Sequence, residues 1–198
     1  MNTPTNYKYN TNLRINGFTL FEVLIGITIG SLLLGLVLSI YSLTVRSLSS
    51  SQNRSELANN SRIIIDRLTR DLRQARQIAT PLPTVSNDPN LAPPNGIEVQ
   101  DGHDINAVRY VRYYLSGTDL KRQIREYYFP AEPAVLVTFD AVDDFSNPAS
   151  VRIIEDELVG QYVTGLAFYG INLITVELQL TKGKIIHTTA TQFYGRNL

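Results

Sequence analysis

One carboxylate stands alone in the most apolar part of the chain. Residues 18–45 form a predominantly apolar run, and Glu22 is its only charged residue. On insertion scales an ionised carboxylate at the centre of a membrane helix costs about 3 kcal/mol, and less near an end. Because of this cost, an acidic residue in such a segment marks function by default. The sequence therefore predicts that Glu22 has a functional role and needs a partner cation.

The rest of the chain offers few groups for catalysis. The only imidazoles are His103, in a turn-like loop, and His187, in a predicted strand. The absence of cysteine excludes disulfides, thiolate metal sites and cysteine nucleophiles. The sequence contains no Gly-x-Ser-x-Gly elbow, phosphate-binding glycine loop or His-Glu-x-x-His helix. We therefore predict a protein that is not an enzyme and carries no cofactor.

Two acidic clusters offer the oxygen ligands that a hard cation such as Ca²⁺ prefers. The first consists of Asp140, Asp143 and Asp144, and the second of Glu155, Asp156 and Glu157. Neither cluster follows the EF-hand spacing, and runs of acidic residues usually lie in solvated loops. We therefore predict no metal site.

A long helix is expected to position Glu22. The apolar run exceeds the roughly 20 residues that a helix needs to cross a bilayer, so residues 18–45 are predicted to be a transmembrane helix. No proline lies between Pro4 and Pro81, so this helix can continue as an amphipathic helix over residues 46–79. Its apolar stripe, at spacings of three and four, consists of Leu57, Ser61, Ile64, Leu68, Leu72, Ala75 and Ala79. We expect this stripe to pack on a sheet.

Residues 80–198 have the pattern of a β-rich head. Residues 80–106, which include five prolines, are predicted to be a loop region. Beyond them, alternating apolar residues and turn residues predict strands at 107–115, 120–129, 151–154, 163–169, 171–181 and 184–193. The first two strands form a hairpin around Gly117, the last two form a hairpin around Gly183, and the tyrosines of the first hairpin are expected to pack across it. The expected fold class is α+β, with a long helix on one antiparallel sheet.

Charge is unevenly distributed although the formal net charge is zero. Residues 46–76 carry a surplus of four positive charges, and residues 77–198 carry a deficit of five. Phosphate binding requires a basic patch, so an acidic head is a poor surface for nucleic acid. No direct binding of nucleic acid is expected.

The residues around Glu22 resemble the class III signal of type IV prepilins and pseudopilins. In that family a short basic leader ends in Gly, the next residue is usually Phe, and Glu stands at the fifth mature position. Here residues 1–17 would be the leader, Gly17 its last residue, Phe18 the first mature residue and Glu22 the fifth. A secretory signal peptide places its cleavage site after the apolar stretch. The apolar helix is therefore expected to stay in the mature protein, and the alternative is an ordinary uncleaved signal anchor.

The resemblance implies a pilin-like fold and a defined maturation. Prepilin peptidase would cleave after Gly17, and the new amine of Phe18 would be N-methylated. In the family the glutamate pairs with the amine of a neighbouring subunit, which here would relieve two unsolvated charges at once. The implied protein is a single-pass inner-membrane protein with its head outside the cytoplasm. Its implied partners are prepilin peptidase, other pilin or pseudopilin subunits and the inner-membrane assembly platform.

Weaker similarities indicate a subtype. Residues 62–75 are similar to the post-membrane helix of J-type minor pseudopilins of type II secretion and of W-type minor pilins. The tyrosine-rich hairpin with Leu120 and Arg122, and the ending at residues 194–197, are similar to the same group. This implies a structural minor subunit of a type II secretion pseudopilus or a type IV pilus. The alternatives are a subunit of a DNA-uptake or adhesion pilus whose head binds ligand directly, and an anchored enzyme.

Overall fold

The computed structural model describes residues 17–103 and 108–195. Most of the expected leader, residue Asp104 of the His103 loop and the last two residues of the expected ending at 194–197 lie outside these ranges. Within the described ranges one helix, α1 (Leu20–Gln74), is followed by nine strands. The strands are β1 (Gln77–Ile78), β2 (Ile97–Gln100), β3 (Arg109–Ser116), β4 (Asp119–Phe129), β5 (Glu132–Val137), β6 (Ser150–Gly160), β7 (Val163–Tyr169), β8 (Leu173–Lys182) and β9 (Ile185–Tyr194). The chain divides into two compact units, one ending at Leu48 and one beginning at Ser49.

The first unit contains the apolar part of α1. Within the described residues α1 is the one helix that is long and apolar enough to cross a membrane, and none of its apolar window is buried inside the protein. Its hydroxyl groups bond to the carbonyls of their own helix. Thr28 Oγ1 donates to the carbonyl of Ile25 and Ser39 Oγ donates to that of Gly35, both at 2.8 Å. Such internal bonds satisfy polar groups where water is absent, which suits an N-terminal membrane anchor.

The helix ends earlier than the sequence predicted. It was expected to reach Ala79, but it ends at Gln74, and residues 77–78 form strand β1 instead. The backbone amide of Arg76 donates to the carbonyl of Gln100 at 3.1 Å, and Ile78 pairs with Val99 of β2. Pairing with a strand more than twenty residues later therefore replaces the last helical turn. Because this pairing is long-range, the end of the helix could not be predicted from local helix propensity.

The head contains two antiparallel sheets instead of the single sheet that was expected. The six-stranded sheet has the order β1-β2-β3-β4-β5, with β6 also paired to β4, and the three-stranded sheet has the order β7-β8-β9. Both predicted hairpins are confirmed, and their turn glycines have the positive φ that such turns require, 65° at Gly117 and 62° at Gly183. Strands β1, β2 and β5 were not predicted. Strand β2 lies in the segment expected to be loop, where its two apolar residues, Ile97 and Val99, are both buried.

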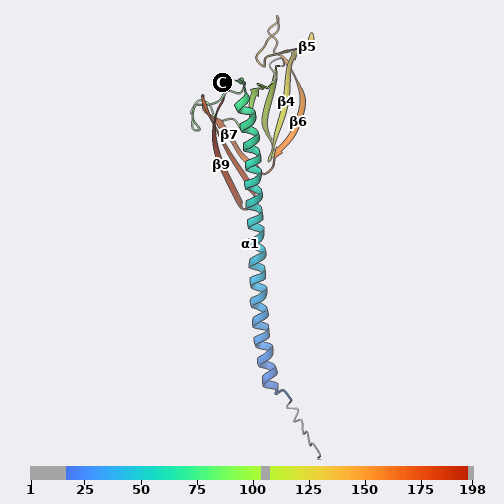
Figure 1. Cartoon of the computed structure of the whole chain (residues 1–198), viewed down its shortest axis with the longest axis vertical. Coiled ribbons are helices and arrows are strands. Elements are labelled where there is room, and N and C mark those ends of the chain that lie inside the picture. Colours follow the sequence, from blue (N-terminus) through green and yellow to red (C-terminus); the bar gives the residue numbers. More distant parts are fainter. Residues whose placement is uncertain (1–16, 104–107, 196–198) are drawn as a thin grey trace, which may run out of the picture. The chain divides into compact units, whose positions relative to one another are not determined.

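Residues of α1 in the second unit pack against both sheets and form one core with them (Figure 1). The predicted stripe is confirmed from Leu57 to Ala75, because each of its members in that range is buried. It contacts inward-facing residues of the six-stranded sheet, including Val111 and Tyr113, and of the three-stranded sheet, including Phe168 and Ile174. The result is a pilin-like α+β fold in which the helix is shared by two layers.

Candidate functional site

The start of α1 is closed by a reciprocal pair of hydrogen bonds between Thr19 and Glu22. The Thr19 backbone amide and Thr19 Oγ1 both donate to Glu22 Oε2 at 2.9 Å, and the Glu22 amide donates to Thr19 Oγ1 at 3.3 Å. This is a capping box, with Thr19 as the N-cap and Glu22 three residues later. The helix therefore begins at Leu20. The sequence-based expectation that it begins at Phe18 is wrong, because the cap stops helical geometry at Thr19.

Thr19 is the residue of this site that the sequence analysis missed. The signal was present in the Thr-x-x-Glu spacing, which is the recognised sequence pattern of a capping box. The cap satisfies amides that a helix otherwise leaves without partners at its first turn. The carboxylate of Glu22 also lies at the positive end of the helix dipole, which favours negative charge. In the described chain Glu22 therefore already has a structural role of its own.

The two residues before the cap are open to the surroundings. Gly17 and Phe18 lie outside the helix, and the side chain of Phe18 is 87% exposed. A side chain built at Gly17 would meet no other atom within 4 Å. The peptide bond between these residues is therefore accessible to another protein, and folding of this chain places no demand on glycine at this position. An amine formed at Phe18 would precede the cap residue directly.

A buried charge network ties α1 to the six-stranded sheet. Asp71 of the helix accepts hydrogen bonds at 2.7 Å from the hydroxyl of Tyr113 on β3 and from Nε of Arg122 on β4. Burial raises the pKa of the Tyr113 phenol, and the neighbouring Asp71 carboxylate raises it further. Burial disfavours the charge of Arg122, but the hydrogen bond to Asp71 and the negative charges of Asp71 and Glu157 together outweigh burial, so the pKa of the guanidinium is raised. The network therefore consists of a charged pair and a neutral phenol.

Glu157 of β6 extends this network to a third strand. Its Oε1 accepts from Arg122 Nη1 at 3.2 Å and from Nη2 of Arg67, on the helix, at 2.6 Å. Glu157 belongs to the acidic cluster at residues 155–157 that was expected in a solvated loop. That expectation is wrong, because all three residues lie on β6 and pair with β4. Asp156, for example, accepts a hydrogen bond at 3.0 Å from Gln123.

The other sequence candidates lie apart from one another. Asp143 caps its own turn by accepting bonds from Phe145 and Asn147, and the bond from the Asn147 side chain lowers the Asp143 pKa. His103 Nδ1 lies 2.8 Å from Asp101, whereas His187 lies on β9 with its Nε2 3.1 Å from Thr189 Oγ1. Within residues 17–103 and 108–195 no three histidine or acidic side chains are arranged to hold a metal ion.

Replacing Asp71 by alanine should lower the free energy of unfolding of the head by about 3 kcal/mol, because Arg122 would keep a buried charge without its partner. Thermal unfolding of the full chain in detergent, followed by circular dichroism, measures this loss. Asp66→Ala is the matched control on the same helix, since its side chain is 68% exposed and its pair with Arg62 spans 4.0 Å. An equal loss in both variants would show that the Asp71 network does not stabilise the head.

Comparison with known families found one match at this end of the chain. A profile described as the prokaryotic N-terminal methylation motif matches residues 12–38, the range that contains Gly17, Phe18 and Glu22. No curated protein matches the sequence. The motif implies processing by prepilin peptidase, and proteins of the pilin family are generally structural. With this motif at the start of a long apolar helix, and with a pilin-like α+β fold behind it, the chain is a type IV pilin-like protein with an N-terminal methylation signal.

Proposed function

We propose that the chain is a minor pilin or pseudopilin subunit, assembled into a type II secretion pseudopilus or a type IV pilus. The observation that carries this proposal is the methylation motif over residues 12–38, placed so that Glu22 lies in the first turn of an exposed apolar helix. Prepilin peptidase would cleave between Gly17 and Phe18, and the new Phe18 amine would be methylated. The role is structural rather than catalytic.

The geometry of Glu22 supports a role in docking between subunits. Both hydrogen bonds to its carboxylate end on Oε2, and Oε1 accepts none within the described residues. One oxygen therefore caps the helix while the other remains open to a cation. In a hydrocarbon layer the methylated amine of a neighbouring Phe18 would be such a cation, and pairing would offset the desolvation of both charges.

The apolar helix supports the same proposal through its exposed surface. Side chains along its first unit are largely exposed, among them Leu24, Leu34 and Leu43 at 55%, 62% and 71%. Lipid covers such a surface in the membrane, and helices of neighbouring subunits would cover it in a filament. Gly26, Gly30 and Gly35 have open space around them, and small residues of this kind allow close approach of helices.

The proposed location follows from the same elements. The leader would stay in the cytoplasm, α1 would cross the inner membrane once, and the head would lie outside. The partners would be prepilin peptidase, other pilin or pseudopilin subunits and the inner-membrane assembly platform. The similarity of residues 62–75 to J-type pseudopilins and W-type pilins supports a minor subunit. No cofactor and no nucleic acid are part of this proposal.

The proposal is tested on the full chain expressed in a host that has prepilin peptidase. The membrane fraction should contain a mature protein whose intact mass corresponds to a start at Phe18 with one methyl group. The same fraction, crosslinked, should yield covalent complexes with the other minor subunits of the host filament. A mature protein that begins near residue 45, or a processed chain that is never crosslinked to such subunits, would contradict the proposal.

A further inference from the structure

Strand β9 has a free edge that differs from the other long free edges of the head. In the described chain β6, β7 and β9 are each paired on one side only. The pairing of β6 with β4 is interrupted by two register shifts, and that of β7 with β8 by one. The pairing of β9 with β8 continues without interruption from Tyr194 to Ile185. Strand β9 therefore presents a long, regular edge.

The composition of β9 distinguishes its edge from that of β6, although β7 also has no charged residue. None of its ten residues, Ile185–Tyr194, is Asp, Glu, Lys or Arg, whereas β6 contains Arg152 and the acidic residues 155–157. Soluble proteins protect free edges from pairing with other chains by means of bulges, charges, prolines or short strands. Strand β6 shows two of these devices and β9 shows none. An unprotected edge of this kind is typical of a strand that another chain covers.

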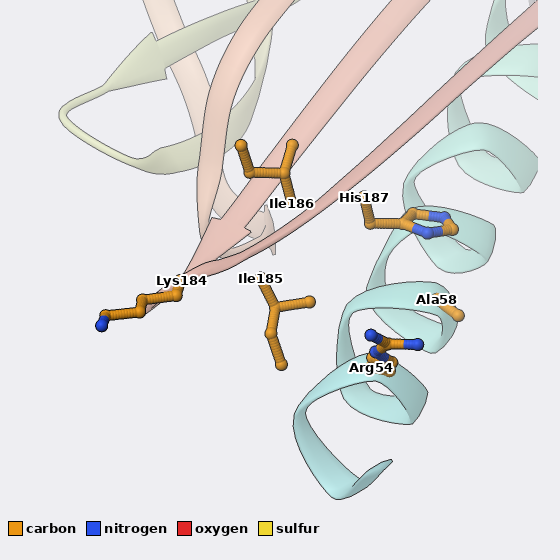
Figure 2. Close-up of a pocket in the computed structure, with 6 residues that line it drawn as sticks. All are labelled: Arg54, Ala58, Lys184, Ile185, Ile186 and His187. Carbon is orange, nitrogen blue, oxygen red and sulfur yellow. The ribbon is translucent and has the colours of Figure 1, made fainter. Parts of the chain in front are cut away.

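A groove lies between β9 and one face of α1. A cavity of about 570 Å³ is lined by residues 184–187 together with Arg54 and Ala58 of the helix. Figure 2 shows His187 projecting toward the helix while Ile186 lies on the opposite side of the strand. A second cavity, of about 590 Å³, lies farther along the strand and is lined by Ile65, Asp66, Thr69, Arg70, Arg73, Gln74 and Thr191. Helix positions 54, 58, 65, 69 and 73 lie on one face.

This groove is basic. Arg54 and Lys184 line the first cavity and Arg70 and Arg73 line the second, and none of the four forms an ion pair within the described residues. The acidic side chain present, Asp66, lies 4.0 Å from Arg62. Gln74 Oε1, in the second cavity, is the one buried side-chain polar atom of the described chain without a hydrogen-bond partner. The groove therefore offers positive charge beside the open backbone groups of β9.

We propose that the β9 edge is a docking site for an extended acidic segment of a partner chain. The segment would add a fourth strand beside β9, forming main-chain hydrogen bonds with the free edge. Side chains at alternate positions of such a strand point to the same face of the sheet. One of the two faces of the added strand would be directed to α1. Acidic side chains at these positions would meet Arg54, Arg70 and Arg73. The site is separate from Glu22 and needs no contact between membrane helices.

Synthetic peptides test the site on the full chain in detergent micelles. The probe is a ten-residue peptide of alternating Thr and Glu, and the charge control is the same peptide with Lys in place of Glu. The backbone control is the Thr-Glu peptide methylated at every backbone nitrogen, which keeps the charge but removes the donors that a strand needs. Titration calorimetry measures binding, and hydrogen exchange measures the protection of amides at residues 185–194.

The expected result is binding by the Thr-Glu peptide alone, with slower exchange confined to β9. Arg70→Glu should weaken this binding at least about tenfold, since it reverses one charge of the groove. Lys121→Glu makes the same change of charge on β4 of the other sheet and should leave the affinity unchanged. Arg70→Glu should keep the thermal stability of the parent chain, because Arg70 is exposed and forms no ion pair in the described structure. Lys121→Glu removes a favourable charge near Asp156, so its folding is verified by the same thermal unfolding measurement.

Three results would overturn the proposal. The first is failure of the Thr-Glu peptide to bind, and the second is binding that survives methylation of its backbone, which would indicate charge attraction without strand addition. The third is protection of β6 or β7 in place of β9. Because the peptide assay involves no processing and no membrane assembly, these results are independent of the fate of the proposed function.

Discussion

Replacing Gly17 by leucine should leave essentially all of the protein as uncleaved precursor in the membrane. A side chain added at this position meets nothing within 4 Å in this chain, so folding gives no reason for a defect. The obstacle would arise in the peptidase, which must accept the residue before the scissile bond. Gly17 is also exposed and outside the helix, so the variant should keep the capping box that begins at Thr19.

Intact mass of the membrane-bound protein measures this prediction, since precursor and mature chain differ by the whole leader. Gly26→Leu is the matched control, because Gly26 also has open space around it but lies inside the apolar helix. The control should be processed as the parent chain is. Normal maturation of Gly17→Leu, with a start at Phe18, would show that the peptidase does not require a small residue at position 17. The proposed role of Gly17 in processing would then be wrong.

Replacing Glu22 by valine should abolish incorporation into a filament while leaving cleavage intact. The change removes an ionised group from the apolar segment, which makes membrane insertion easier by up to about 3 kcal/mol. The methylated amine of a neighbouring subunit would then lose its partner in hydrocarbon. Crosslinking to partner subunits, measured beside membrane fractionation and intact mass, should show a mature, membrane-bound chain that no partner captures.

The capping box requires a second variant, because Glu22→Val also removes half of the cap. Thr19→Ala removes the other half at a cost of about 1 kcal/mol and leaves the carboxylate in place. If Glu22 acts as the docking partner, Thr19→Ala should still be captured by other subunits. Equal loss of capture in both variants would assign the defect to the start of the helix and remove Glu22 from the proposed docking contact.

Features with local causes could be predicted from the sequence. The apolar run, the stripe from Leu57 to Ala75 and the two hairpins each depend on residues close in the chain, so their spacing is enough to reveal them. The placement of Glu22 five residues after Gly17 is of the same kind. The start of the helix could also have been predicted, since the Thr-x-x-Glu pattern that makes Thr19 the N-cap is visible in the sequence.

The tertiary structure decided what depends on distant partners. Helix α1 stops at Gln74 because β2 pairs with residues 77–78, and no local signal competes with that contact. Asp71 can be buried because Tyr113 and Arg122, which follow it by 42 and 51 residues, lie on neighbouring strands and donate hydrogen bonds to it. A free edge likewise exists only once a sheet has formed. The sequence by itself thus determined the apolar helix and its processing signal, whereas the charge network and the open edge of β9 depend on long-range strand pairing, which residue spacing does not encode.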